Sequence, residues 1–234
     1  MNKYTKQTRI LTAVDCIIFG FDGTELKLLL IKRAFEPQKG NWSLMGGFVQ
    51  ATENFDEAAK RVLKQLTGLD GVYLEQLYAF GAIDRDPLER TISIAYFALI
   101  DIHKYQTQIS EEYHAEWMPV KQVPALIFDH PQMIKMAKAK LQYKAALHPI
   151  LFELLPDKFT LPQLQSLYEG VYDTEFDKRN FSRKVLSTGL LIKQKEKEKA
   201  SSKKGAFFYK LNKRSYKANF QAFLNIIPNA HKLK

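Results

Sequence analysis

The segment of residues 47–69 has the spacing of a loop–helix–loop that could present carboxylates to metal ions. Its frame consists of Gly47, Glu53, Arg61 and Gly68. Positions 62, 65 and 66 are related by i, i+3 and i+4 steps, so they share one helix face. Carboxylates there would bind divalent cations, which prefer oxygen ligands. These positions instead hold Val62, Gln65 and Leu66, so only Glu53 remains as a carboxylate of the frame.

Local signals place a helix within this segment. Asn54 can cap its start and Glu57, three residues on, can complete a capping box. Gly68 suits the helix end. Glu57 and Arg61 lie four residues apart, so we expect them to pair with each other.

The segment resembles the Nudix box, G-x5-E-x7-R-E-U-x-E-E-x-G-U, where U is aliphatic. The positions in register are Gly47, Glu53, Arg61, Leu63, Gly68 and Leu69. In Nudix enzymes the box carboxylates hold metals that polarise a pyrophosphate and activate a water. The loss of three glutamates favours a sensor over an enzyme. An ordinary amphipathic helix is the alternative interpretation.

Composition limits the remaining possibilities. The 234 residues suffice for two modest domains, and 46% are hydrophobic. The single Cys16 excludes an internal disulfide and fits a reducing cytoplasm. No N-terminal stretch resembles a signal peptide, and no apolar run reaches membrane-spanning length. We expect a cytoplasmic protein without a membrane contact.

Charge divides the chain. Residues 1–149 hold 18 Lys and Arg against 17 Asp and Glu, whereas residues 150–234 hold 17 against 8. The net charges, +1 and +9, sum to the +10 of the whole chain. A basic module of this kind usually binds nucleic acid, and a solvated lysine-rich surface is the alternative. Pro149 marks the predicted boundary between domains 1–149 and 150–234.

The first domain has the pattern of an α/β fold. Apolar runs at 11–19 and 27–33 predict a hairpin around Asp22 and Gly23. Residues 42–49 resemble the strand and glycine turn that precede a Nudix box, and the composition of 91–100 predicts another strand. Helical spacing extends over 129–147.

The second domain has the element order of a winged helix. Thr160 and Gln163 predict the capped start of a helix that carries an apolar stripe. The chain is expected to turn after Gly170. A second helix over 177–187 would bury Phe181 and Val185, with Leu186 beside them. Strands at 190–195 and 206–211 would flank a wing loop, 196–205.

The exposed side of that second helix suits DNA. Arg and Lys neutralise phosphates, whereas Arg and Asn also recognise bases in the major groove. The predicted DNA-binding residues are Lys178, Arg179, Asn180, Ser182, Arg183, Lys184 and, in the wing, Lys203 and Lys204. Solvated surface charges are the alternative for each.

Nearly the whole chain resembles the Nudix-related transcriptional regulators. Further marks are residues 84–87, Arg90, 92–96, 159–169 and 177–181. The resemblance implies a Nudix-like α/β/α sandwich followed by an α+β winged helix-turn-helix domain. It also implies a homodimer that binds a double-stranded operator and a small effector. One branch of the family senses ADP-ribose and another L-arabinose.

The resemblance places the effector beside the box. The candidate residues are Arg33, Trp42, Gly46, Gly47, Phe48, Gln50, Glu53, Arg61, Arg85 and Arg90. Each has a structural alternative: Trp42 could belong to the core, Arg61 could pair with Glu57 or Glu53, and Arg90 could be a surface charge. His114 and His130 are expected to be structural or solvent-facing, because no His or Cys has ligand spacing with them. No metal ligand, catalytic residue or cofactor is therefore predicted.

The sequence thus predicts a regulator that is not an enzyme. L-arabinose is preferred over ADP-ribose as effector, because a neutral sugar needs no metal platform. A pocket without ligand, in a domain that only dimerises, is one alternative. The other is a Nudix pyrophosphohydrolase for ADP-ribose or nucleotides, with Glu53 and Glu111, Glu112 or Glu116 supplying carboxylates.

Overall fold

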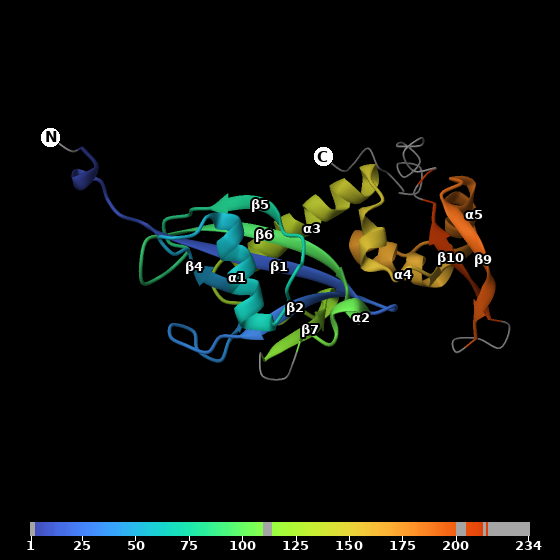
Figure 1. Ribbon diagram of the computed structural model, residues 1–234, viewed down its shortest axis with the longest axis horizontal. Coiled ribbons are helices and arrows are strands. Elements are labelled where there is room, and N and C mark those ends of the chain that lie inside the picture. The colour runs from blue at the N-terminus through green and yellow to red at the C-terminus, as the bar shows by residue number, and fades with distance from the viewer. Residues whose placement is uncertain (1–2, 110–113, 200–204, 213, 215–234) are drawn as a thin grey trace.

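The computed structural model describes residues 3–109, 114–199, 205–212 and 214. The predicted residues Glu111, Glu112, Lys203 and Lys204 lie outside this part of the chain. Figure 1 shows a larger sheet-based part and a smaller part rich in helices.

The larger part is built on a seven-stranded mixed sheet of order β3-β2-β1-β6-β5, with β4 paired to β1 and β7 paired to β2. The strands are β1 (Leu11–Phe21), β2 (Leu26–Lys32), β3 (Trp42–Ser43), β4 (Met45–Phe48), β5 (Glu75–Phe80), β6 (Thr91–Asp101) and β7 (Ala115–Pro119). Strands β1 and β6 run parallel, and the other pairings are antiparallel. The predicted hairpin of β1 and β2 is confirmed.

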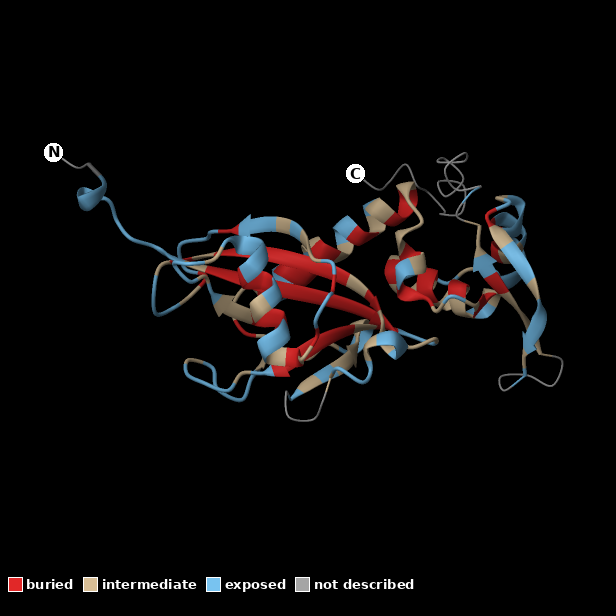
Figure 2. Cartoon of the chain, viewed as in Figure 1, coloured by how far each residue is buried: buried red, intermediate tan, exposed pale blue. Residues whose placement is uncertain are grey.

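Two helices cover the two faces of this sheet, as Figure 1 shows. They are α1 (Phe55–Thr67) and α3 (His130–Leu147); the short helices are η1 (Lys3–Lys6), α2 (Ile102–Tyr105) and η3 (Val120–Gln122). Successive side chains of a strand point to opposite faces. Ile18 of β1 therefore shares a buried cluster with Val62 of α1, whereas Phe19 shares one with Met133 of α3. Figure 2 shows the sheet as the buried centre. The α/β/α sandwich is confirmed.

Local capping signals were reliable in this part. Asn54 and Glu57 form the predicted capping box of α1, and Gly68 ends the helix in the left-handed region. The predicted glycine turn before the box is wrong, however. Gly46 and Gly47 lie within strand β4, where they pair with Asp15 and Val14 of β1.

The smaller part is a winged helix, as predicted. Its elements are η4 (Ile150–Leu154), β8 (Phe159–Thr160), α4 (Leu161–Tyr172), α5 (Lys178–Ser187), β9 (Leu191–Glu198) and β10 (Ala206–Leu211). The strands form a sheet of order β8-β10-β9. Thr160 and Gln163 form the predicted capping box of α4.

Three details of this part differ from the sequence prediction. Gly170 lies inside α4 rather than at its end, and a glycine suits this position because a Cβ there would come 3.0 Å from Cβ of Leu26. The chain turns instead at Asp173, which has a φ of 50°. Leu186 is 44% exposed, so only Phe181 and Val185 of α5 are buried. Strand β9 extends to Glu198, which shortens the wing loop.

The two parts share one cluster of buried apolar side chains. It contains Phe19 of β1 and Met133 of α3 together with Leu151 of η4 and Leu164 of α4. The domain boundary between residues 149 and 150 stays a prediction. None of the helices among the described residues has the length and apolar character to cross a membrane.

Candidate functional site

The helix face that would carry metal ligands is used for packing. Val62 is 2% exposed, and a Cβ on Gly47 would come 2.7 Å from its Cγ2. Leu66 packs against the same apolar cluster as Val62. Gln65 is exposed, and its side-chain oxygen accepts a hydrogen bond from Nη1 of Arg61 at 3.1 Å. This face therefore stabilises α1 against β4.

The remaining carboxylate of the frame is held by an arginine. Arg61 donates from Nε to Oε2 of Glu53 at 2.7 Å and from Nη2 to Oε1 at 2.5 Å. Nη2 also donates to the carbonyl of Phe48 at 2.9 Å. The hydrogen bonds from Arg61 lower the pKa of Glu53 to about 2. The predicted pair of Glu57 and Arg61 is wrong, because Glu57 accepts from the backbone N–H of Asn54 in the capping box.

These donors do not fit a Nudix-type metal centre. Val62 and Leu66 offer no oxygen, and both oxygens of Glu53 accept from Arg61. Within the described ranges, no three His, Cys, Asp or Glu side chains are grouped so as to hold a metal ion.

A small cavity of 70 Å³ with a largely apolar lining lies beside Gly46 and Gly47. It is bounded by β1, β4, the loop after β2, the loop before β6 and the start of α3. Its lining comprises Ala13, Asp15, Arg33, Phe35, Ser43, Gly46, Gly47, Phe48, Arg85, Asp86, Thr91, Phe128 and His130. We call these residues the box pocket.

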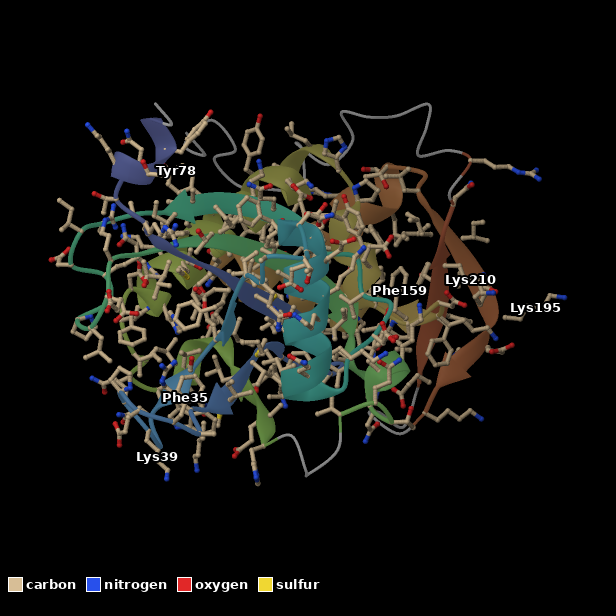
Figure 3. All side chains as sticks on the ribbon, turned by 60° about the vertical axis from the view of Figure 1, so that its left-hand side comes forward. Phe35, Lys39, Tyr78, Phe159, Lys195 and Lys210 are labelled. Carbon is tan, nitrogen blue, oxygen red and sulfur yellow. The ribbon has the colours of Figure 1, made fainter. Side chains whose placement is uncertain are left out.

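Arginine and aromatic rings form the rim of the box pocket. The guanidinium of Arg33 lies 4.0 Å from the ring centroid of Phe35 and 5.5 Å from that of Phe128. Burial lowers the pKa of Arg33, but an arginine stays protonated in proteins. Phe35 and Phe48 are 55% and 51% exposed; Phe35 is labelled in Figure 3. A cation between flat apolar faces suits an anionic ligand with an aromatic ring.

The floor of the box pocket is a buried network of charged side chains. Arg85 donates to both carboxylate oxygens of Asp129, at 2.9 and 2.8 Å. Asp15 accepts from Oγ of Ser93 at 2.6 Å and lies 3.6 Å from Nη2 of Arg85. Nε2 of His130 lies 3.5 Å from Oδ1 of Asp15. This network joins β1, the loop before β6 and the first residues of α3.

The protonation state of His130 follows from its partners. The backbone N–H of Leu44 donates to its Nδ1 at 3.1 Å, so the ring proton is on Nε2 and faces Asp15. Burial lowers the pKa of His130. His130 is therefore neutral at pH 7, and of the two expectations for it, structural or solvent-facing, the structural one fits.

Half of the predicted effector residues line the box pocket: Arg33, Gly46, Gly47, Phe48 and Arg85. The others have different surroundings. Glu53 and Arg61 bind each other, and Trp42 packs against the core with Nζ of Lys32 5.0 Å from its ring. Arg90 donates to the carbonyls of Gly81 and Ala82, which fixes its loop, and Gln50 is exposed outside the pocket. The role of all ten in effector binding stays a prediction.

Several residues of this pocket were not predicted from the sequence. They are Ala13, Asp15, Phe35, Ser43, Asp86, Thr91, Phe128 and His130; Asp129, which binds Arg85 from outside the pocket, was not predicted either. The position of Asp15 within a largely apolar strand sequence was an available signal, since a carboxylate buried there needs a partner.

Larger cavities lie elsewhere, at 540 Å³ beside Lys60 and Tyr73 and at 620 Å³ beside Lys104 and Asp157. Neither contains a predicted effector residue. The box pocket is the better candidate despite its size, because it combines Gly46 and Gly47 with a cation and aromatic faces.

The second candidate surface is the exposed side of α5. Asp177 caps this helix by accepting from the N–H of Asn180 at 2.9 Å. Lys178, Arg179, Asn180, Arg183 and Lys184 are exposed, and Ser182 is half-buried. Nη2 of Arg183 donates to Oδ1 of Asn180 at 2.9 Å, so these two side chains orient each other. Buried Phe181 and Val185 fix the opposite side of the helix.

Strand β9 adds basic side chains beside α5. Lys193, Lys195 and Lys197 are exposed at alternate positions, and Lys193 and Lys197 lie 3.7 and 4.5 Å from the ring of Phe207. Figure 3 shows Lys195 pointing away from the molecule, far from Phe35. From the sequence, wing contacts were predicted only at Lys203 and Lys204.

Both parts of the chain match known domain families. Residues 9–139 match the NUDIX domain, and residues 151–211 match the NrtR DNA-binding winged helix domain. The chain is 35% identical over 225 residues to the ADPR responsive transcriptional repressor NtrR of Acinetobacter baylyi. This match covers 94% of this chain and 89% of that relative.

Two other relatives differ in character. The ADP-ribose pyrophosphatase of Methanocaldococcus jannaschii is 35% identical over 136 residues, covering 58% of this chain and 77% of the enzyme. The crystal structure of Shewanella oneidensis NrtR complexed with a 27mer DNA matches with a TM-score of 0.72 at 30% identity. That match covers 88% of this chain and 95% of the other.

Proposed function

This chain belongs to the Nudix-related transcriptional regulators, in which a NUDIX domain precedes an NrtR-type winged helix, and we propose that it is an ADP-ribose-responsive repressor. In this proposal, α5 binds duplex DNA, and the box pocket binds the effector. The observation that carries it is the box pocket itself, where Arg33 lies between aromatic faces in the same chain as a basic recognition helix.

The proposed DNA interface consists of α5 and β9. The N-terminal residues of a recognition helix contact base edges, and here they are Lys178, Arg179 and Asn180. Arg183 is oriented by Asn180, and Lys184 supplies a charge near the helix end. We assign base contacts to Arg179 and Asn180 and phosphate contacts to Lys184 and the lysines of β9. Similarity to a regulator solved with DNA supports this assignment.

We propose ADP-ribose as the effector in place of L-arabinose, whose preference is not supported. The sugar prediction relied on Trp42, Phe48 and Gln50, and of these only Phe48 lines the box pocket. Arg33 offers a positive charge to a pyrophosphate, and exposed Phe35 and Phe48 offer faces to an adenine ring. Because the cavity encloses only 70 Å³, most of a nucleotide would lie over this rim. The repressor of A. baylyi is described as ADPR responsive.

We further propose that the chain binds ADP-ribose without hydrolysing it. Val62 and Leu66 occupy two positions of the box carboxylates, and the Glu53 carboxylate is bound by Arg61. A Nudix pyrophosphohydrolase with an accessory DNA-binding domain is the second candidate, favoured by the similarity to an ADP-ribose pyrophosphatase. Of its proposed extra carboxylates, Glu116 lies exposed in β7 and pairs with Leu30.

One experiment separates the two candidates. The protein is incubated with ADP-ribose and Mg²⁺ or Mn²⁺, and AMP release is followed by chromatography beside a duplex-binding assay on the same sample. Duplex binding without AMP release supports the regulator. AMP release that disappears in Glu53→Gln identifies the hydrolase.

We retain two further features as part of this proposal. The effector and DNA-binding domains would be residues 1–149 and 150–234. A homodimer would place two copies of α5 on two half-sites of an operator. Sedimentation velocity at micromolar concentration tests the dimer.

A further inference from the structure

Helix α3 connects the box pocket to the winged helix. Its first residue, His130, lines the box pocket, and its N-cap Asp129 binds Arg85 of the same pocket. Asp129 consequently makes no side-chain capping hydrogen bond to α3. The start of α3 is thus attached to the pocket floor by charged side chains.

The middle of α3 holds the turn before α5. Nζ of Lys138 lies 2.6 and 2.5 Å from the two carboxylate oxygens of Asp173. One helical turn on, Nε2 of Gln142 donates to the carbonyl of Val171 at 2.8 Å, and the hydroxyl of Tyr172 donates to the carbonyl of Gln142 at 2.9 Å. These contacts join α3 to the last turn of α4 and to its C-cap.

The turn that α3 holds determines where α5 lies. Asp173 adopts the left-handed conformation that ends α4, and α5 begins at Lys178. Two side chains of α4 hold the end of this turn. Glu169 accepts from the N–H of Phe176 at 3.0 Å, and Gln165 donates to the carbonyl of Phe176 at 2.9 Å. A displacement of α3 would therefore be carried through Asp173 to the base-contacting end of α5.

The body of α3 is suited to transmit such a displacement. Met133, Ala137 and Leu141 are fully buried against the sheet and the smaller part. With a rise of 1.5 Å per residue, the path from His130 to Gln142 is about 18 Å. Figure 1 shows α3 passing behind the sheet toward α4.

We propose that α3 couples the box pocket to the recognition helix, and that Lys138 and Gln142 are the residues that transmit the effector signal. This inference rests on the proposed function. An anionic ligand that reaches Arg85 would compete with the carboxylates of Asp129 and Asp15 for its guanidinium, shift the start of α3 and thereby move the turn at Asp173. Lys138 and Gln142 lie outside both the box pocket and α5, so we assign them as positioning residues.

The test compares how strongly ADP-ribose changes operator affinity in each variant, rather than the operator affinities themselves. Operator affinity is measured by fluorescence anisotropy with and without saturating ADP-ribose in the wild type, in Lys138→Met/Gln142→Leu and in Asp173→Asn. Asparagine tolerates the left-handed conformation, so Asp173→Asn removes the charge but not the turn. The matched control is Lys140→Met, because Lys140 is exposed on the same helix and forms no ion pair with another described residue.

In the wild type and in Lys140→Met, ADP-ribose should change operator affinity by roughly 5- to 150-fold, the usual range of allosteric coupling. In the double variant and in Asp173→Asn, the ratio of operator affinities with and without ADP-ribose should fall to within about twofold of one. The affinity for ADP-ribose, measured without DNA, should be retained in both. If ADP-ribose changes operator affinity in both variants as much as in the wild type, the coupling role of α3 is overturned, but the proposed function is not. A wild type that binds no duplex, or whose binding ignores ADP-ribose, overturns the proposed function as well. Loss of ADP-ribose binding in folded Asp173→Asn also contradicts the proposal, because Asp173 would then serve the pocket directly.

Discussion

The guanidinium of Arg61 binds both carboxylate oxygens of Glu53, through Nε at 2.7 Å and Nη2 at 2.5 Å. This pair joins the loop after β4 to the middle of α1. It also satisfies the two charged residues that the Nudix frame retains. The effector site proposed above accordingly lies next to the box, where Arg33 and the aromatic rim lie.

The first prediction concerns the cation of the box pocket. Arg33→Gln should weaken ADP-ribose binding by roughly 10- to 150-fold, since a hydrogen bond to a charged group contributes about 1.5–3 kcal/mol. Isothermal titration calorimetry measures the change. Lys39→Gln, in the same loop but outside the pocket and labelled in Figure 3, is the control and should bind as the wild type does. Equal affinity in both variants would exclude Arg33 as a ligand.

The second prediction concerns base recognition. Arg179→Ala should cost roughly 1–3 kcal/mol of operator affinity and relax sequence preference if Arg179 contacts a base. Lys184→Ala should weaken all duplexes alike and lower the salt slope by about 0.9 for each phosphate that is no longer neutralised. Anisotropy titrations at several salt concentrations separate the two effects. A uniform loss in Arg179→Ala would reassign it to phosphate.

The third prediction concerns the glycines of β4. A Cβ at Gly46 would collide with Oδ1 of Asp15, so Gly46→Ala should lower the free energy of unfolding by about 1–3 kcal/mol, as overpacking does. Gly81→Ala is the control, because its Cβ would lie 3.8 Å from Ile92. Urea denaturation compares them. Gly46→Ala with wild-type stability would show that Asp15 can move freely, contrary to the buried network.

The fourth prediction concerns pH. Burial holds the pKa of His130 below its ordinary value of 6.5, so the unfolded chain binds more protons than the folded one between these two pKa values. The stability that comes from keeping His130 neutral is fully present above pH 6.5 and is lost as the pH falls from 6.5 toward the pKa of His130 in the folded chain. The urea midpoint should therefore decrease from pH 7.5 to pH 5.5, and less so in His130→Gln. The same decrease in both proteins would assign the effect to other groups.

Local chemistry explains which features the sequence could predict. The capping boxes of Asn54 with Glu57 and of Thr160 with Gln163 involve residues three positions apart, and both were predicted. Of the two partners considered for Arg61, the favoured Glu57 was wrong, because its carboxylate caps its own helix, and the alternative Glu53 is the one that the loop brings within reach.

Long-range pairing explains what the sequence could not predict. Asp15 and His130 meet only because the fold brings β1 and the start of α3 together. A single sequence contains no signal for that convergence. The interior position of Gly170 likewise depends on Leu26 of a distant hairpin.

The most direct test of an ADP-ribose-responsive regulator is a single titration. A duplex enriched by the intact protein from a random-sequence pool is titrated with protein at fixed salt, with and without ADP-ribose, and with L-arabinose as the comparison. We predict that ADP-ribose changes the Kd by at least about fivefold, the lower end of typical allosteric coupling, whereas L-arabinose leaves it unchanged. A Kd that responds to L-arabinose and not to ADP-ribose, or to neither, would contradict this assignment.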